Sequence, residues 1–111
     1  MITLKKVNLQ DAFSLVNEYS EPTIVGELND QEIRLLKLKG ECTWHHHEKE
    51  DGMFLVIKGN LTICFHTGDI MLNEGDFIII PRGVEYKLIA FDETHVFLFE
   101  PRLGLKHQHW K

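Results

Sequence analysis

Apolar residues at helical spacing occur in one segment near the start of the chain. Asn8 stands where the cap of a helix is expected, Asp11 falls in the first turn, and Pro22 cannot continue the helix. The pattern predicts one short helix in an N-terminal extension that covers residues 1–23. The positions that define its apolar face are Leu9, Ala12, Phe13, Val16 and Tyr19.

From Ile24 onward the pattern changes to short runs that are apolar throughout or alternate between apolar and polar residues. Glycines recur between these runs every seven to twelve residues, at positions 40, 52, 59, 68, 75 and 83. Such spacing is typical of sequentially joined strands in an all-β sandwich or barrel and leaves no room for crossover helices. We expect the barrel to cover residues 24–100 and a tail to follow over residues 101–111. The predicted strands are Val25–Leu28, Ile33–Lys39, Cys42–His47, Met53–Lys58, Leu61–His66, Ile70–Leu72, Phe77–Pro81, Val84–Phe91 and Thr94–Glu100.

Composition and charge narrow the class of protein. With 111 residues, 43% of them hydrophobic and 26% charged, the chain has the make-up of one globular domain. The net charge of -5 and the absence of basic clusters with interleaved aromatic residues argue against nucleic acid as a partner. No apolar run approaches the length of a membrane span, so a cytoplasmic protein is expected. Cys42 and Cys64 lack a CxxC spacing, which suits reduced thiols in that compartment.

The most informative stretch runs from Gly40 to Gly59 and contains three consecutive histidines. Alternate side chains of a strand share a face, so His45 and His47 point the same way while His46 points to the opposite side. Two imidazoles in that arrangement are close enough to hold one metal ion. The alternative is a polar, solvated strand end beside the acidic turn.

This stretch resembles the first motif of the cupin superfamily. Gly40, His45, His47 and Gly59 fall at or within one place of that motif. Gly75, Pro81 and Gly83 are similar to the second motif, in register. The resemblance covers roughly residues 24–100 and points to small single-domain cupins. It implies an antiparallel double-stranded β-helix, also called a cupin or jelly-roll barrel, with a short N-terminal helix.

Two positions depart from the cupin pattern. In cupins that bind a divalent metal, the resemblance implies four ligands: two histidines and a glutamate of the first motif, and a histidine of the second. Here the glutamate position is Gly52 and the second-motif histidine position is Tyr86. Glu50 has the parity of Gly52 and could complete a site with His45 and His47. The sequence therefore leaves two possibilities: the protein binds a divalent metal such as manganese, iron, nickel or zinc, or it binds none.

The parity of the strands separates the inside of the barrel from the outside. The tight turn at Gly59-Asn60 sets Val56 opposite Ile63 and Phe54 opposite Phe65. If position 52 faces inward, these side chains line a mostly apolar pocket or fill a core. Met53, Leu55 and Ile57 then face outward, and their apolar surface predicts a homodimer. The predicted pocket consists of His45, His47, Phe54, Val56, Ile63, Phe65, Tyr86 and Leu88.

Three functions remain open at this point. The first is a small-molecule-binding cupin whose metal site has degenerated, with His45, His47 and Tyr86 as its polar groups. The second is a metal-dependent cupin enzyme of the isomerase, dioxygenase or decarboxylase type that uses the two histidines. The third is a dimeric structural or interaction protein. His107 and His109 repeat the period-2 spacing, but a terminal segment of this kind is expected to be a tail.

Overall fold

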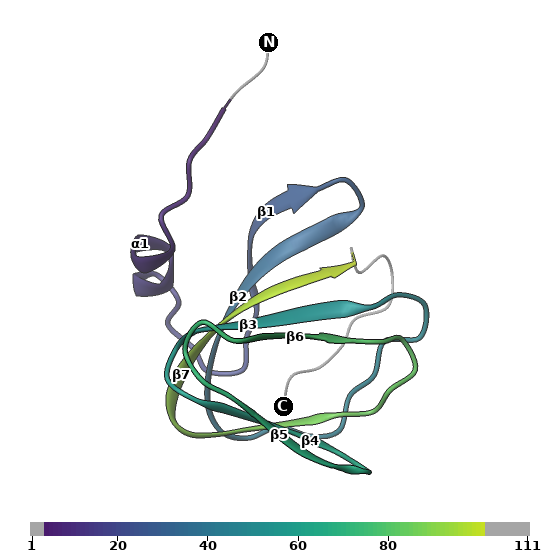
Figure 1. The fold of residues 1–111 in the computed structure, drawn as a ribbon. Helices are drawn as coiled ribbons and strands as arrows, with labels where there is room; N and C mark the ends of the chain where they lie inside the picture. The colour runs from purple at the N-terminus through teal and green to yellow at the C-terminus, as the bar shows by residue number, and fades with distance from the viewer. Residues whose placement is uncertain (1–3, 102–111) are drawn as a thin grey trace.

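The computed structural model describes residues 4–101 and shows a curled antiparallel β-sheet preceded by one short helix (Figure 1). Hydrogen-bonded neighbours follow the order β1-β2-β7-β3-β6, and β4 pairs with β5 and β7. The predicted all-β cupin barrel with a short N-terminal helix is confirmed. The elements are α1 (Leu9–Ser14), β1 (Thr23–Leu28), β2 (Gln31–Glu41), β3 (Gly52–Lys58), β4 (Leu61–Phe65), β5 (Gly68–Leu72), β6 (Phe77–Ile80) and β7 (Lys87–Pro101).

Strand β7 joins the two layers of the barrel. It pairs with β2 along nearly its whole length, with β3 through its C-terminal half, and with β4 through its first residues. The prediction of two separate strands with a turn at Asp92-Glu93 is therefore wrong. The register between β2 and β7 shifts between Leu38 and Gly40 of β2, so β7 bends opposite these residues while it stays paired with β2. In Figure 1 this bend lies where β7 turns from the upper layer toward β4 and β5.

The segment from Cys42 to His47 is not a continuous strand, contrary to the prediction. It is attached to the chain before β7 through the bridge between His45 and Tyr86. His45 N donates to Tyr86 O at 2.8 Å, and Tyr86 N donates to His45 O at 2.9 Å. Gly83 N donates to His47 O at 2.6 Å. These three backbone bonds fix the histidine segment without the full ladder of a strand.

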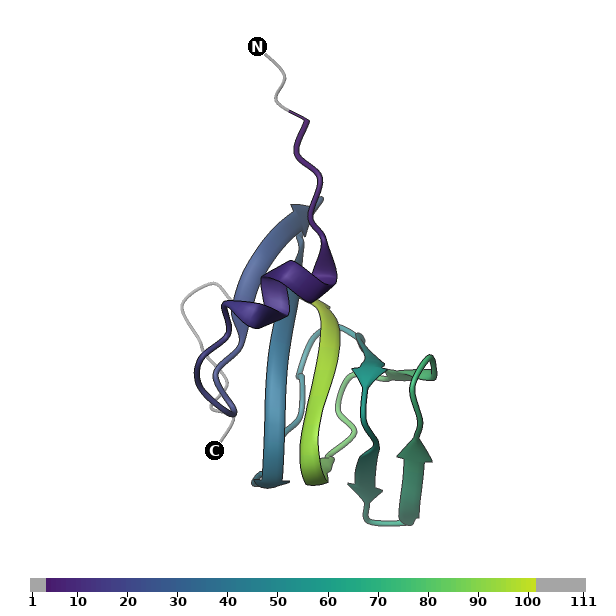
Figure 2. The same cartoon turned by 90° about the vertical axis from the view of Figure 1, so that its left-hand side faces the viewer.

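The helix is shorter than the apolar pattern suggested. Asn8 caps it by accepting a hydrogen bond from Asp11 N at 2.9 Å, and the helix ends at Ser14. Phe13 and Val16 then pack on Leu35, with Ile57 and Phe97 partly buried against them. The outward position of Ile57 is thus covered by the N-terminal segment. Figure 2 shows α1 lying across β2.

The core lies between the two layers and follows the predicted parity. Phe54, Val56, Ile63, Tyr86 and Leu88 are fully buried in one cluster, and Phe65 is partly buried against it. Cys42 and Cys64 are free and buried, which agrees with the prediction of reduced thiols. No helix in the described part of the chain is long and apolar enough to cross a membrane. The predicted tail with His107 and His109 lies outside the described residues.

Candidate functional site

The structure brings His45, His47 and Tyr86 together at one end of the barrel. The bridge between His45 and Tyr86 places their ring centroids 6.0 Å apart, and the centroids of His47 and Tyr86 are 6.2 Å apart. Phe54 meets the Tyr86 ring edge-on, with centroids 5.4 Å apart. Tyr86 has no exposed surface, whereas His45 and His47 are 8% and 7% exposed. His45 Nε2, His47 Nδ1 and the Tyr86 hydroxyl are buried, so these polar atoms of the cluster are withdrawn from solvent.

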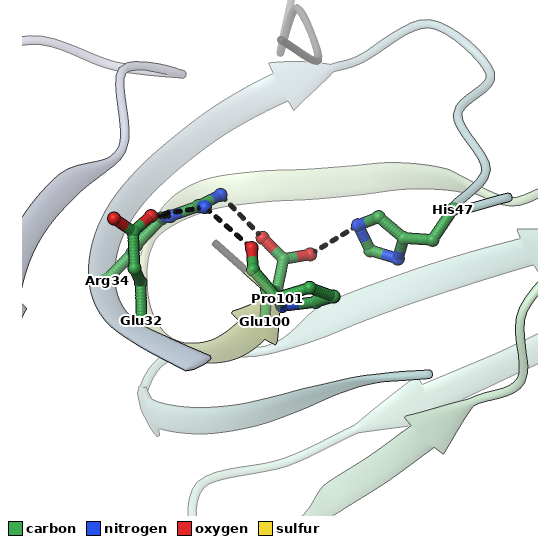
Figure 3. A network of polar contacts seen from close by, with 5 residues as sticks. All are labelled: Glu32, Arg34, His47, Glu100 and Pro101. Carbon is green, nitrogen blue, oxygen red and sulfur yellow. Dashed lines mark hydrogen bonds and ion pairs between the residues drawn. The ribbon is translucent and has the colours of Figure 1, made fainter. Parts of the chain in front are cut away.

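His47 belongs to a buried network of charged side chains that the sequence did not reveal (Figure 3). His47 Nε2 lies 2.8 Å from Glu100 Oε2. The other oxygen of Glu100 accepts a hydrogen bond from Arg34 at 3.1 Å. Arg34 also donates to Glu32 at 2.6 Å and to the Pro101 carbonyl at 3.1 Å. Three ionisable side chains are thus arranged in a chain that ends on the imidazole.

Gly52 provides the room that this arrangement needs. Its neighbour Met53 pairs with Phe99, so Gly52 lies beside Glu100 on the adjacent strand. A Cβ at position 52 would stand 3.1 Å from His47 Cε1 and 3.5 Å from Glu100 Oε2. The position on β3 that corresponds to the ligand glutamate of metal-binding cupins is therefore a glycine. The carboxylate of Glu100, on β7, lies next to it.

Glu50 does not join the histidines. It lies in an exposed turn, where its Oε2 accepts a hydrogen bond from Gln31 Nε2 at 3.0 Å. Asp51 Oδ1 accepts from Arg82 N at 2.9 Å and holds the same turn on the outside of the barrel. The predicted ligand set of His45, His47 and Glu50 is therefore not assembled.

The residues around the site do not fit a metal ion. Within residues 4–101, no group of three or more His, Cys, Asp or Glu side chains is arranged to hold one. Burial and the charge of Glu100 raise the pKa of Tyr86 well above 10, so the phenol keeps its proton and is a poor ligand at neutral pH. Glu100 is already paired with Arg34, whose guanidinium would repel a cation.

The apolar side chains that were expected to line a pocket pack as core. Phe54, Val56, Ile63 and Leu88 have no exposed surface, and Phe65 lies at the margin of their cluster. An open depression of about 1000 Å³ adjoins the site at Gly52, which is one of its lining residues. Met53, Ile79 and Phe99 contribute apolar side chains to its lining, and Glu50 and Arg82 contribute charged ones.

The sequence contains a signal for the charged network, which lies in the parity of two strands and not in a motif. Glu100 has the inward parity of Val96 and Leu98, and Arg34 has that of Leu36 and Leu38. A charged residue at an inward position is buried only with a partner. Two such residues on different strands therefore indicate a buried ion pair.

Comparison with known proteins identifies the family. The model of the cupin domain matches residues 33–100. The crystal structure of a cupin-2 domain containing protein from Shewanella frigidimarina is 40% identical, covers 86% of this chain and 94% of that one, and superposes with a TM-score of 0.85. The uncharacterized protein YdbB of Bacillus subtilis is 31% identical over 90 residues, which span 78% of this chain and 80% of that protein.

A more distant likeness extends to an enzyme. Hydroquinone 1,2-dioxygenase PnpCD, solved in complex with Cd²⁺ and 4-hydroxybenzonitrile, is 14% identical, covers 99% of this chain and 85% of that one, and has a TM-score of 0.75. At this identity the likeness concerns the fold alone. The match over residues 33–100, together with the 40% identical cupin-2 domain structure and the barrel itself, shows that the chain belongs to the cupin family.

Proposed function

We propose that this cupin binds a small molecule at the end of its barrel and does so without a divalent metal. His45, His47 and Tyr86 provide the polar groups of the site, and Phe54, Val56, Ile63, Phe65 and Leu88 provide its apolar support. The observation that carries this proposal is the pairing of Glu100 with Arg34 beside Gly52. The carboxylate nearest the histidines is thereby neutralised by a cation that the protein supplies itself.

The electrostatics of the site favour this reading over a metal-dependent enzyme. A divalent ion bound between the histidines and Glu100 would have to compete with a guanidinium that is 3% exposed and held by two carboxylates. Two buried unit charges of like sign repel strongly, because little water screens them. The enzyme alternative therefore requires that Arg34 and Glu100 separate when a metal binds.

Calorimetric titration with manganese, iron, nickel and zinc tests the metal-independent site. Protein purified without an affinity tag should give no saturable heat at micromolar concentration. A His45→Ala variant, which removes one imidazole, should behave like the wild type. Stoichiometric binding that His45→Ala abolishes would reject the proposal in favour of the metal-dependent enzyme.

A thermal-shift screen against small metabolites tests ligand binding directly. A compound that binds the site raises the melting temperature of the wild type, because it binds the folded state alone. The increase should be lost in His45→Ala and kept in His66→Ala, since His66 is exposed and pairs with Glu85 at 2.9 Å away from the cluster. Shifts that survive His45→Ala would place the ligand elsewhere.

We also propose a homodimer formed through the outer face of β3 and β6. Phe77 and Ile79 are 60% and 56% exposed, and they pair with Leu55 and Met53 on the neighbouring strand. Contiguous apolar surface of this kind is typical of interfaces between copies of a chain. Light scattering should report twice the mass of one chain, and Ile79→Asp should reduce it to the mass of one. Phe91→Asp is the matched control, because Phe91 is 81% exposed on β7, away from this face. A wild-type monomer would refute the proposal.

A further inference from the structure

The two ring nitrogens of His47 lie in different surroundings. Nε2 is 2.8 Å from Glu100 Oε2. Nδ1 is buried and has no hydrogen-bond partner within residues 4–101. An unprotonated Nε2 and a carboxylate oxygen are both negative and repel each other at that distance, whereas an N–H group attracts the oxygen, so Nε2 carries a proton. In a neutral imidazole the lone pair then resides on Nδ1.

Glu100 is fixed as the acceptor in this pair. Arg34 has only donors, and it directs one of them to Glu100 Oε1 at 3.1 Å. Glu32 Oε1 holds the other side of the guanidinium by accepting from Nε at 3.2 Å and from a terminal nitrogen at 2.6 Å. Strands β2 and β7 set this geometry, because Glu32 is the register partner of Glu100. The carboxylate therefore cannot turn away from His47 without leaving Arg34.

We propose that the chain Glu32–Arg34–Glu100 orients His47 in place of a metal, with the proton on Nε2, so that Nδ1 accepts a hydrogen bond from a hydroxyl or N–H group of the ligand. This assignment rests on the proposed small-molecule function and specifies the chemistry of its ligand. Glu100 and Arg34 are positioning residues, since they act through the imidazole. Burial and the charge of Glu100 raise the pKa of Tyr86, and the same two effects disfavour an anionic group at this place.

Nitrogen NMR of ¹⁵N-histidine-labelled protein tests the assignment, because a protonated and an unprotonated ring nitrogen have well-separated shifts. The chain has seven histidines, so the His47 signals are identified by their loss in His47→Gln. The wild type should show Nε2 protonated and Nδ1 unprotonated. A proton on Nδ1, alone or together with one on Nε2, would overturn the proposal.

Glu100→Gln provides a second, directional test. Arg34 should attract the carbonyl oxygen of the new side chain, which turns the amide NH₂ toward His47 Nε2. Nε2 must then become the acceptor, and the two nitrogen signals should exchange their character. Glu85→Gln is the matched control, because it makes the same change at an exposed carboxylate that pairs with His66 outside this network, and it should leave the His47 pattern unchanged. An unchanged pattern in folded Glu100→Gln would contradict the positioning role.

The result is separable from that of the metal titration. Tight metal binding would refute the proposed function even if Nε2 carries the proton in the free protein. A proton on Nδ1 would refute the assignment of Nδ1 as the acceptor even if no metal binds. Should Glu100→Gln fail to fold, the wild-type spectrum alone decides the question.

Discussion

Replacing Arg34 with methionine tests the ion network most directly. The guanidinium side chain is 3% exposed, and it contacts the carboxylates of Glu32 and Glu100, whose side chains are 11% and 1% exposed. Methionine retains much of the apolar stem but leaves two buried carboxylates without their cation. Removing one partner of a buried ion pair costs about 3 to 5 kcal/mol, because the charge that remains has lost both water and counter-ion. We expect the free energy of unfolding to fall by about that amount.

Neutralising the whole network should restore most of this stability. In the triple variant Arg34→Met, Glu32→Gln and Glu100→Gln, no buried charge remains, and replacement of complete buried ion groups is often neutral or stabilising. Urea denaturation of the wild type, Arg34→Met and the triple variant measures both effects. A loss below about 1 kcal/mol in Arg34→Met, the range of exposed ion pairs, would refute the view that the network is desolvated.

Three further predictions follow from other parts of the structure. Gly52→Ala should destabilise the fold by about 1 to 3 kcal/mol through overpacking, because its Cβ would lie 3.1 Å from the His47 ring, whereas Gly26→Ala meets its nearest atom at 3.6 Å and should cost less; chemical denaturation compares the two. Phe54→Ala should cost about 3 to 5 kcal/mol and Phe65→Ala clearly less, since Phe54 is fully buried and Phe65 is not; equal losses by the same method would contradict the packing. Hydrogen bonds from His95 and Tyr19 lower the pKa of Glu93 from 4.5 to about 2, so their stabilisation is complete above about pH 4.5 and is lost as the pH falls toward 2. Melting curves of the wild type and Tyr19→Phe should therefore converge at low pH, and a constant difference would argue against this linkage.

The barrel and its inner face were predictable because they depend on local periodicity. Alternation along β3 and β4 identified Phe54, Val56 and Ile63 as inward residues, and all three are fully buried. Glycines at turn spacing marked the strand ends, and Gly40 and Gly59 adopt positive φ angles of 98° and 90°. Where side chains alternate and turns require particular backbone angles, the sequence alone determines the element.

The strand boundaries around the bend were not predictable in the same way. Asp92 and Glu93 look like turn residues, yet β2 shifts its register opposite them and keeps the strand continuous. His45 and His47 alternate like strand residues, yet the strand-like pairing of this segment is one bridge, between His45 and Tyr86. Both outcomes depend on a partner far away along the chain, which local patterns do not contain.

The charged network shows the same limit at the site. The inward parity of Glu100 could be read from the sequence, but its pairing with Arg34 depends on how β2 and β7 meet. Glu50 lies close to Gly52 along the chain, whereas Glu100 approaches Gly52 across the sheet. Proximity along the chain and proximity across strands are different relations, and the register decides the second.

The position of β7 along the chain has a consequence for how the protein folds. Its residues pair with β2, β3 and β4, and its pairing with β2 joins Gln31 to Pro101. Contacts between residues so distant in sequence form slowly, because a long loop must close before they stabilise anything. During synthesis the edges of these three strands therefore remain unpaired until β7 has left the ribosome.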